Sequence, residues 1–230
     1  MLLSSAPFGT DHDAPAAPEQ RAVFIDKDGT LVDDVPYNVD PALVRFTPHA
    51  IEALHLLASR GYALIVVTNQ PGIALHLFDR AALSRLEQAL TRMLAAEGVQ
   101  LQGFYACPHS APAGRVANCL CRKPAPGLLH QAARAHRLNL QESWMVGDIL
   151  DDVEAGRRAG CRSVLLDVGH ETEWRLSPLR TPHHRAADLL AAALHIVEHD
   201  ERDAAARAHR AAGIATTPAR IVASSQSAPR

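Results

Sequence analysis

Two aspartates, Asp26 and Asp28, follow the apolar run 23–25 and are separated by a single residue. Alternate residues of an extended chain point to the same side, so both carboxylates can face one ligand. Gly29 comes next, and glycine lets the backbone turn sharply without a Cβ clash. The pattern predicts a buried strand that ends by presenting two carboxylates to a ligand at a sharp turn, although a lone pair of this kind is more often an acidic surface turn.

Other polar side chains follow later apolar runs in the same way. They are Thr68 and Asn69, then Asp148, Asp151 and Asp152, with Arg122 and Lys123 just before a predicted helix. Thr68 could instead be a simple strand-end hydroxyl, and the last two acids could be helix caps. Carboxylates that crowd together repel unless a hard cation joins them, and Mg²⁺ beside a substrate phosphate is the usual partner. Two cations beside such a metal indicate an anionic substrate.

Three of the four cysteines lie in one irregular segment together with a histidine. Cys107, His109, Cys119 and Cys121 place four soft ligands within fifteen residues. This is the ligand set of a closed, tetrahedral Zn²⁺ site, which would be structural and would order the loop before Arg122 and Lys123. Free thiols in a loop are the alternative. The fourth cysteine, Cys161, is expected to be a small buried residue.

The elements that must position these residues are read from hydrophobic periodicity. Strands are predicted at 23–25, 62–68, 103–107, 143–146 and 162–166. Helices are predicted from a Thr47 cap with Pro48 at the first position to Gly61, from an Asp79 cap to Gly98, and at 128–138, 151–159 and 186–197. Strands that alternate with helices indicate a parallel sheet covered on both faces, which presents its ligands at the carboxyl ends of the strands.

Length and charge limit the remaining possibilities. A chain of 230 residues suits one α/β domain, expected at 21–198, with a disordered leader at 1–20 and a helix-prone or disordered tail at 199–230. The net charge of −2 gives no reason to expect a nucleic-acid or membrane partner. The first residues lack the pattern of a signal peptide, so we expect a cytoplasmic protein with reduced thiols or metal ligands. A monomer is a separate expectation.

Taken together, the motifs resemble those of a known superfamily. Segments 26–30, 68–69 and 147–152, together with Lys123, are similar to the four motifs of the haloacid dehalogenase superfamily of phosphatases. Segments 68–74, 107–109 and 119–127 resemble its heptose-bisphosphate and histidinol-phosphate phosphatase branch. The resemblance covers roughly residues 21–198, and ordered motifs are far more specific than one alone. It implies a Rossmann-like, three-layer sandwich with a central parallel sheet, no large cap domain and a zinc-stabilised loop.

The resemblance also implies roles. Asp26 would be the nucleophile that forms an aspartyl-phosphate, and Asp28 the general acid and base. Thr68 and Lys123 would hold the phosphoryl oxygens. Mg²⁺ would be bound by Asp26, the main chain of Asp28 and Asp148, with Asp152 behind these ligands. The residues expected to contact substrate are Asp26, Lys27, Asp28, Asp34, Tyr37, Thr68, Asn69, Gln70, Arg122 and Lys123.

The implied substrate is a small phosphorylated sugar. The first expectation is removal of the 7-phosphate of D-glycero-D-manno-heptose 1,7-bisphosphate, and the same motifs permit a histidinol-phosphate phosphatase. The sequence departs from the branch at Lys27, Pro71 and 75–76, in segments that face the leaving group. A zinc-stabilised protein that binds a phosphate ligand without catalysis is a third possibility, but such a protein needs no second acid beside Asp26.

Overall fold

The computed structural model describes residues 19–111 and 119–215. Six parallel strands form one sheet in the order β3-β2-β1-β4-β5-β6. They are β1 Ala22–Ile25, β2 Ala63–Asn69, β3 Gly103–Cys107, β4 Trp144–Gly147, β5 Arg162–Leu166 and β6 His184–Ala186. The strand order reverses beside β1, which pairs with β2 on one side and β4 on the other. Ligands of open α/β sheets bind at this kind of reversal.

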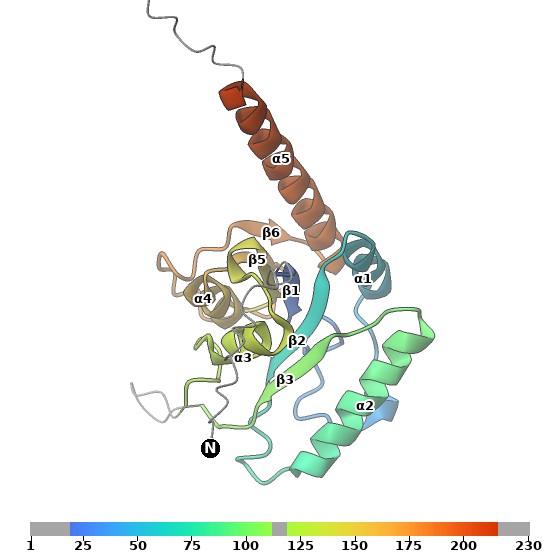
Figure 1. Ribbon diagram of the computed structural model, residues 1–230. Coiled ribbons are helices and arrows are strands. Elements are labelled where there is room, and N and C mark those ends of the chain that lie inside the picture. The colour runs from blue at the N-terminus through green and yellow to red at the C-terminus, as the bar shows by residue number, and fades with distance from the viewer. Residues whose placement is uncertain (1–18, 112–118, 216–230) are drawn as a thin grey trace, which may run out of the picture.

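Helices cover both faces of the sheet (Figure 1). They are α1 Ala50–Ser59, α2 Arg80–Ala96, α3 Gly127–His136, α4 Leu150–Ala159 and α5 Leu189–Ala215, with short 3-10 helices η1 Pro41–Leu43 and η2 Leu140–Glu142. Alternate residues of β1 divide between two apolar clusters: Val23 packs with α1, α2 and α5, whereas Phe24 packs with α3 and α4. Because both of its faces are covered, β1 is apolar at every position. The predicted three-layer sandwich with a central parallel sheet is confirmed.

Two details differ from the sequence prediction. Thr47 does not cap α1, because its hydroxyl donates to the carbonyl of Thr30 at 2.7 Å and thereby ties the loop after β1. The helix begins at Ala50 instead, after His49 in a left-handed conformation with φ of 61°. The Asp79 cap of α2 is confirmed, since the Ala82 N–H donates to its side chain at 2.7 Å. The short edge strand β6 was not predicted.

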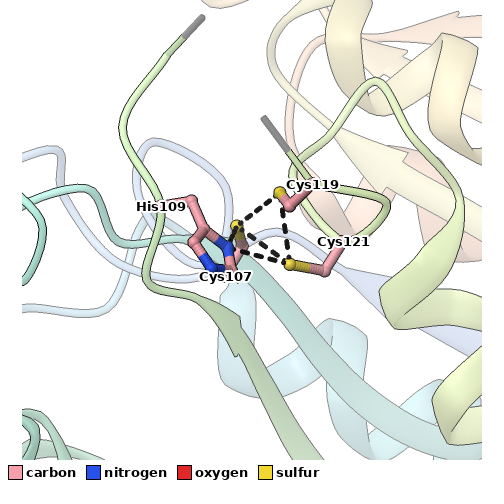
Figure 2. Close-up of side chains that lie close together, drawn as sticks. All are labelled: Cys107, His109, Cys119 and Cys121. Carbon is pink, nitrogen blue, oxygen red and sulfur yellow. Dashed lines mark hydrogen bonds between the residues drawn. The ribbon is translucent and has the colours of Figure 1, made fainter. Parts of the chain in front are cut away.

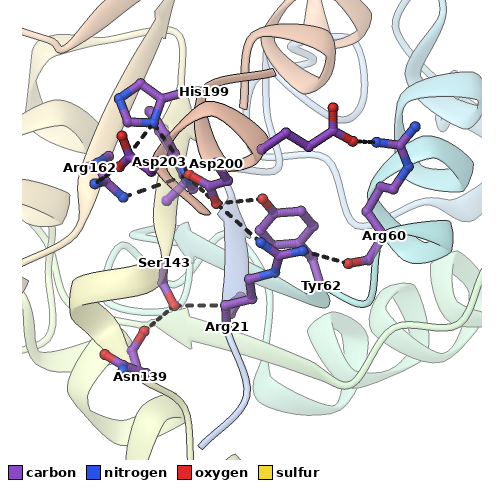
Figure 3. Close-up of polar contacts among 12 residues, drawn as sticks. Arg21, Arg60, Tyr62, Asn139, Ser143, Arg162, His199, Asp200 and Asp203 are labelled. Atoms are coloured by element: carbon purple, nitrogen blue, oxygen red, sulfur yellow. Dashed lines mark hydrogen bonds and ion pairs between the residues drawn. The ribbon is translucent and has the colours of Figure 1, made fainter. Parts of the chain in front are cut away.

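The last helix is longer than the expected 186–197, and its continuation is anchored (Figure 3). Asp200 is only 6% exposed. Its carboxylate accepts hydrogen bonds from the Tyr62 hydroxyl at 2.5 Å and from the Trp144 indole at 3.3 Å. The helix-prone segment predicted from residue 199 is thus helical as far as Ala215 and anchored at Asp200, whereas the described side chains after Asp200 are mostly exposed. The later part of α5 extends away from the body of the molecule (Figure 1).

The expected leader at 1–20 lies almost entirely outside the described residues, apart from Gln20, which forms an isolated bridge with Leu138. Within the described part of the chain, the segments at the carboxyl edge of the sheet are loops and turns, and no cap domain is inserted between the elements. Among the described helices, none combines the length and the apolar character that crossing a membrane requires.

Candidate active site

A cavity of about 360 Å³ opens at the carboxyl edge of the sheet. It is lined by Asp26, Asp28, Asp34, Val35, Pro36, Tyr37, Thr68, Asn69, Gln70, Pro71, Arg122, Lys123, Asp148, Ile149, Asp151 and His170. These residues come from the ends of β1, β2 and β4 and from the loops after β1, β2, β3, β4 and β5, as the parallel topology requires. The fold therefore brings the separate sequence motifs into one pocket.

Lys123 lies between two carboxylates at the floor of this pocket. Its ammonium nitrogen is 2.7 Å from Asp26 Oδ1 and 2.6 Å from Asp152 Oδ1, and it donates to the Val67 carbonyl at 3.0 Å. Burial would lower the pKa of this ammonium, but Asp152 first and Asp26 second outweigh it, so the pKa lies above its usual value. Lys123 is thus a fixed positive charge beside Asp26.

Asp28 is held by residues on both sides of it. Gln70 donates from its amide to Asp28 Oδ2 at 2.9 Å and to the Thr68 hydroxyl at 3.0 Å, while the Lys27 ammonium contacts Asp28 Oδ1. Burial raises the pKa of Asp28; Lys27 opposes this shift and the Asp26 carboxylate adds to it. A carboxyl whose pKa is raised retains a proton more readily than one in water, which suits a general acid.

Asn69 connects β2 to the loop that carries Lys123. Its side-chain amide donates to the Lys123 carbonyl at 3.1 Å, and its side-chain oxygen accepts from the Lys123 N–H at 3.0 Å. Both hydrogen-bonding ends of the amide are engaged with this main chain. Asn69 therefore sets the position of Lys123, in addition to lining the pocket where it was expected to contact substrate.

Asp148 follows β4 and faces Asp26 from across the site. Its Oδ1 accepts from the Thr30 hydroxyl at 3.2 Å, and its Oδ2 lies 2.7 Å from His170 Nδ1. Burial, reinforced by the Asp26 carboxylate, raises the pKa of Asp148 to about 6, while His170 opposes the shift. A raised pKa of this kind is typical of buried carboxylates that share one site.

Three of these carboxylates are placed to hold a cation. One oxygen each from Asp26, Asp148 and Asp152 lie within 4.8 Å of one another, and all three residues are buried. Hard oxygen donors at a phosphate-sized pocket suit Mg²⁺. Asp28 is not part of this group, and a contact of its main chain with the metal stays a prediction. Asp152 shares its carboxylate with Lys123, whereas Asp151 is paired with Arg180 at 2.8 Å.

The cysteine and histidine side chains of the loop after β3 converge (Figure 2). Cys121 Sγ lies 3.3 Å from both Cys107 Sγ and His109 Nδ1, and 3.4 Å from Cys119 Sγ. The edges of a tetrahedral site with Zn–S bonds of 2.3 Å would be roughly 3.8 Å, so the spacing nearly matches that of a bound ion. The Arg122 N–H also donates to Cys119 Sγ at 3.3 Å, which couples this cluster directly to the pocket.

The remaining predicted residues occupy different places around the pocket. Arg122, Asp34 and Tyr37 line it, and Arg122 donates to the His109 carbonyl at 3.1 Å. Lys27 is the exception: its side chain is 4% exposed, pairs with Asp28 and does not line the cavity. The structure thus brings the predicted residues together. Lys27 pairs with Asp28 and does not face the cavity itself.

Sequence reasoning missed the contribution of the loop after β5. His170 lines the pocket beside Asp148, and Glu171 accepts from the Leu150 N–H at 2.6 Å. A signal for them was available, because they follow a strand end just as the recognised site residues do. Thr30 was quoted within the first motif, but its contact with Asp148, 118 positions away, is visible only in the fold.

Comparison with known proteins agrees with this geometry. The family described as HAD-hydrolase-like matches residues 120–193. The D-glycero-β-D-manno-heptose-1,7-bisphosphate 7-phosphatase of Photorhabdus laumondii is 38% identical over 173 residues, which cover 74% of this chain and 88% of that protein. The protein of the same name from Escherichia coli is 38% identical over 149 residues, with coverage of 63% and 78%.

Solved structures show the same relationship. A HAD-like phosphatase of Mesorhizobium loti has a TM-score of 0.67 at 34% identity, covering 79% of this chain and 88% of that one. The D,D-heptose 1,7-bisphosphate phosphatase of B. bronchiseptica, solved with magnesium and phosphate, has a TM-score of 0.64 at 29% identity, with coverage of 78% and 99%. This chain is therefore a phosphatase, and it belongs to the haloacid-dehalogenase-like hydrolases, in the family that contains these heptose-bisphosphate phosphatases.

Proposed function

We propose that this enzyme is a Mg²⁺-dependent phosphomonoesterase that removes the 7-phosphate of D-glycero-D-manno-heptose 1,7-bisphosphate. The observation that carries the proposal is the placement of Asp26 and Asp28 in one pocket with the buried Lys123 ammonium. The names of the relatives support the substrate, and their β-anomer is the one we favour. A protein that only binds a phosphate ligand is not supported by relatives such as those of Photorhabdus laumondii and Escherichia coli, which are named phosphatases.

In the first step, a carboxylate oxygen of Asp26 attacks the phosphorus atom and the bond from phosphorus to the sugar oxygen breaks. Asp28 gives its proton to that oxygen, so the sugar leaves as an alcohol. Lys123 and Thr68 face the transferred group, where negative charge is spread in the transition state. The raised pKa of Asp28 supports this assignment.

In the second step, the aspartyl-phosphate on Asp26 is hydrolysed. Asp28, now a carboxylate, takes a proton from a water molecule whose oxygen attacks phosphorus. The acyl-phosphate bond breaks, inorganic phosphate leaves, and the Asp26 carboxylate and the protonated Asp28 are regenerated. Dividing one displacement into two lets a single acid serve both halves of the reaction. The Gln70 amide keeps Asp28 directed into the pocket throughout.

Two metal sites follow from the donor sets. Asp26, Asp148 and the main-chain carbonyl of Asp28 would hold Mg²⁺, which when bound offsets the repulsion between an anionic nucleophile and an anionic phosphate. Asp152 would support Lys123 behind this site. Cys107, His109, Cys119 and Cys121 would hold a structural Zn²⁺.

The substrate beyond the reacting phosphate would meet the outer wall of the cavity. Arg122 presents a planar guanidinium that suits the second phosphate or a pair of hydroxyls. Asp34 and Tyr37, on the loop after β1, are placed to contact sugar hydroxyls. Together they would select a small polyhydroxylated phosphate ester.

A parallel turnover assay tests the substrate. Purified enzyme with Mg²⁺ is given the α- and β-anomers of heptose 1,7-bisphosphate and, separately, histidinol phosphate. We expect kcat/KM for the β-anomer to exceed that for histidinol phosphate by at least about tenfold, a difference of roughly 1.4 kcal/mol in transition-state binding. Preference for histidinol phosphate would overturn the substrate assignment but leave the phosphatase mechanism intact. A monomeric, cytoplasmic enzyme without nucleic-acid or membrane partners remains a prediction from composition.

A further inference from the structure

The loop between β5 and β6, residues 167–183, is bound to the acidic segment after β4 at three points. His170 contacts Asp148, Glu171 accepts from the Leu150 N–H at 2.6 Å, and Arg180 pairs with Asp151. All three partners lie between residues 148 and 151. Three of the loop's polar contacts thus converge on the short segment that carries Asp148.

The contact between His170 and Asp148 is closely packed. A Cβ added at Gly29 would lie 2.3 Å from Asp148 Oδ2 and 2.6 Å from His170 Nδ1. Gly29 also has φ of 75°, which L side chains rarely adopt. The turn after the acid pair therefore leaves a space that the imidazole and the carboxylate fill together. The sequence indicated that Gly29 is needed for a turn. The structure shows that it is also needed for the contact between His170 and Asp148.

The two remaining contacts fix the backbone that carries Asp148. The Leu150 N–H is at the start of α4, where the first four N–H groups have no partner within the helix. Glu171 satisfies it and adds negative charge at the helix N-terminus, where the helix dipole favours it. Arg180 contacts Asp151 at 2.8 Å and Glu154 at 2.9 Å, and so joins the loop to the first turns of the same helix.

We propose that His170 is a positioning residue that fixes the orientation of the Asp148 carboxylate, while Glu171 and Arg180 hold the loop in place. Thr30 Oγ1 engages one oxygen of Asp148 and His170 Nδ1 the other, so rotation of the carboxylate is restricted from both sides. Removing a group that orients a metal-binding side chain commonly lowers metal affinity 10–100-fold. The inference rests on the proposed function only in assigning Mg²⁺ to Asp148.

The test measures metal binding directly, without turnover. Wild-type protein and the variants His170→Ala and His170→Asn are titrated with Mg²⁺ by calorimetry in the absence of substrate. The Ala variant should bind Mg²⁺ at least about tenfold more weakly. The Asn variant should stay within about threefold of wild type, because its amide nitrogen takes the place of Nδ1 and donates to the same oxygen. Thr172→Ala, an exposed residue of the same loop, should match wild type.

A kinetic measurement separates positioning from direct substrate contact. With Mg²⁺ saturating, His170→Ala should recover most of kcat and keep the KM of wild type, since only the metal occupancy is affected. A raised KM at saturating Mg²⁺ with unchanged Mg²⁺ affinity would instead make His170 a substrate contact and overturn the inference. Equal weakening in the Ala and Asn variants would also overturn it, because space filling alone would then explain the effect.

The calorimetric result is independent of the proposed substrate. If the enzyme proves to act on a different phosphate ester, the Mg²⁺ affinities of the variants still decide the role of His170. If wild-type protein binds Mg²⁺ and His170→Ala binds it equally well, the positioning role is wrong whatever the substrate. Thermal unfolding of each variant confirms that the comparison is made between folded proteins.

Discussion

The chemistry of this protein depends on charged side chains that are buried and in contact with one another. Lys123 is 1% exposed and Asp152 is fully buried, so water does not solvate either charged group. Breaking such a pair is costly, because it leaves an uncompensated charge in the interior. The arrangement therefore holds a positive charge beside Asp26.

The role of Asp26 gives a prediction at the residue scale. Asp26→Asn preserves the shape of the side chain but removes the nucleophilic oxygen, so kcat should fall by roughly three orders of magnitude or more. Binding of a phosphate ester, measured by calorimetry, should persist. The control is Asp167→Asn, which changes an exposed acid at the end of β5 and should leave kcat unaltered. Near wild-type turnover by Asp26→Asn would rule out the covalent mechanism.

At the scale of elements, the site is assembled where strands end and loops begin. β1, β2 and β4 each deliver polar groups at their carboxyl ends, and the loops after β3 and β5 add the cysteine cluster and His170. In the described part of the loop after β3, Leu120 is 83% exposed. The described residues 119–123 are held instead by contacts within the cysteine cluster and by those of Asn69 with Lys123.

The cysteine cluster gives a prediction at this scale. Purified protein should carry about one Zn²⁺ per chain after Mg²⁺ is removed, and turnover should still require Mg²⁺. Cys119→Ser should lose the zinc and lower activity, because Arg122 and Lys123 are no longer held in position. Elemental analysis and steady-state kinetics measure the two effects. Cys161→Ser is the matched control: this thiol lies outside the cluster, so zinc content should not change.

For the whole molecule, α5 joins parts of the chain that are distant in sequence. Asp200 accepts from Tyr62, and the guanidinium of Arg21 lies 3.6 Å from it (Figure 3). It also accepts from the Trp144 indole. The helix thereby contacts residues at the starts of β1, β2 and β4. This anchoring explains why the helix is ordered beyond Val197, where its sequence becomes charged and rich in alanine.

Shortening α5 and replacing its buried Asp200 should have opposite consequences. Deletion of residues 206–230 should preserve fold and activity, because the buried anchor at Asp200 remains. Asp200→Ala should lower the free energy of unfolding by about 2–4 kcal/mol, since it leaves the Tyr62 and Trp144 donors without a partner. Urea denaturation measures both. Glu198→Ala, an exposed acid on the same helix, should change stability by less than about 0.5 kcal/mol. An unstable deletion would show that the end of α5 docks or oligomerises.

The sequence by itself determined the chemistry and the class of fold. The acid pair at 26–28, the cysteine and histidine ligand set and the alternation of strands with helices are local patterns, so spacing along the chain was enough to predict them. Only the tertiary structure showed that Lys123 lies between Asp26 and Asp152, that His170 contacts Asp148, and that Asp200 anchors α5. The last two contacts join residues 22 and 138 positions apart. Strand order and packing bring such residues together, and neither is visible in a local pattern of residue types.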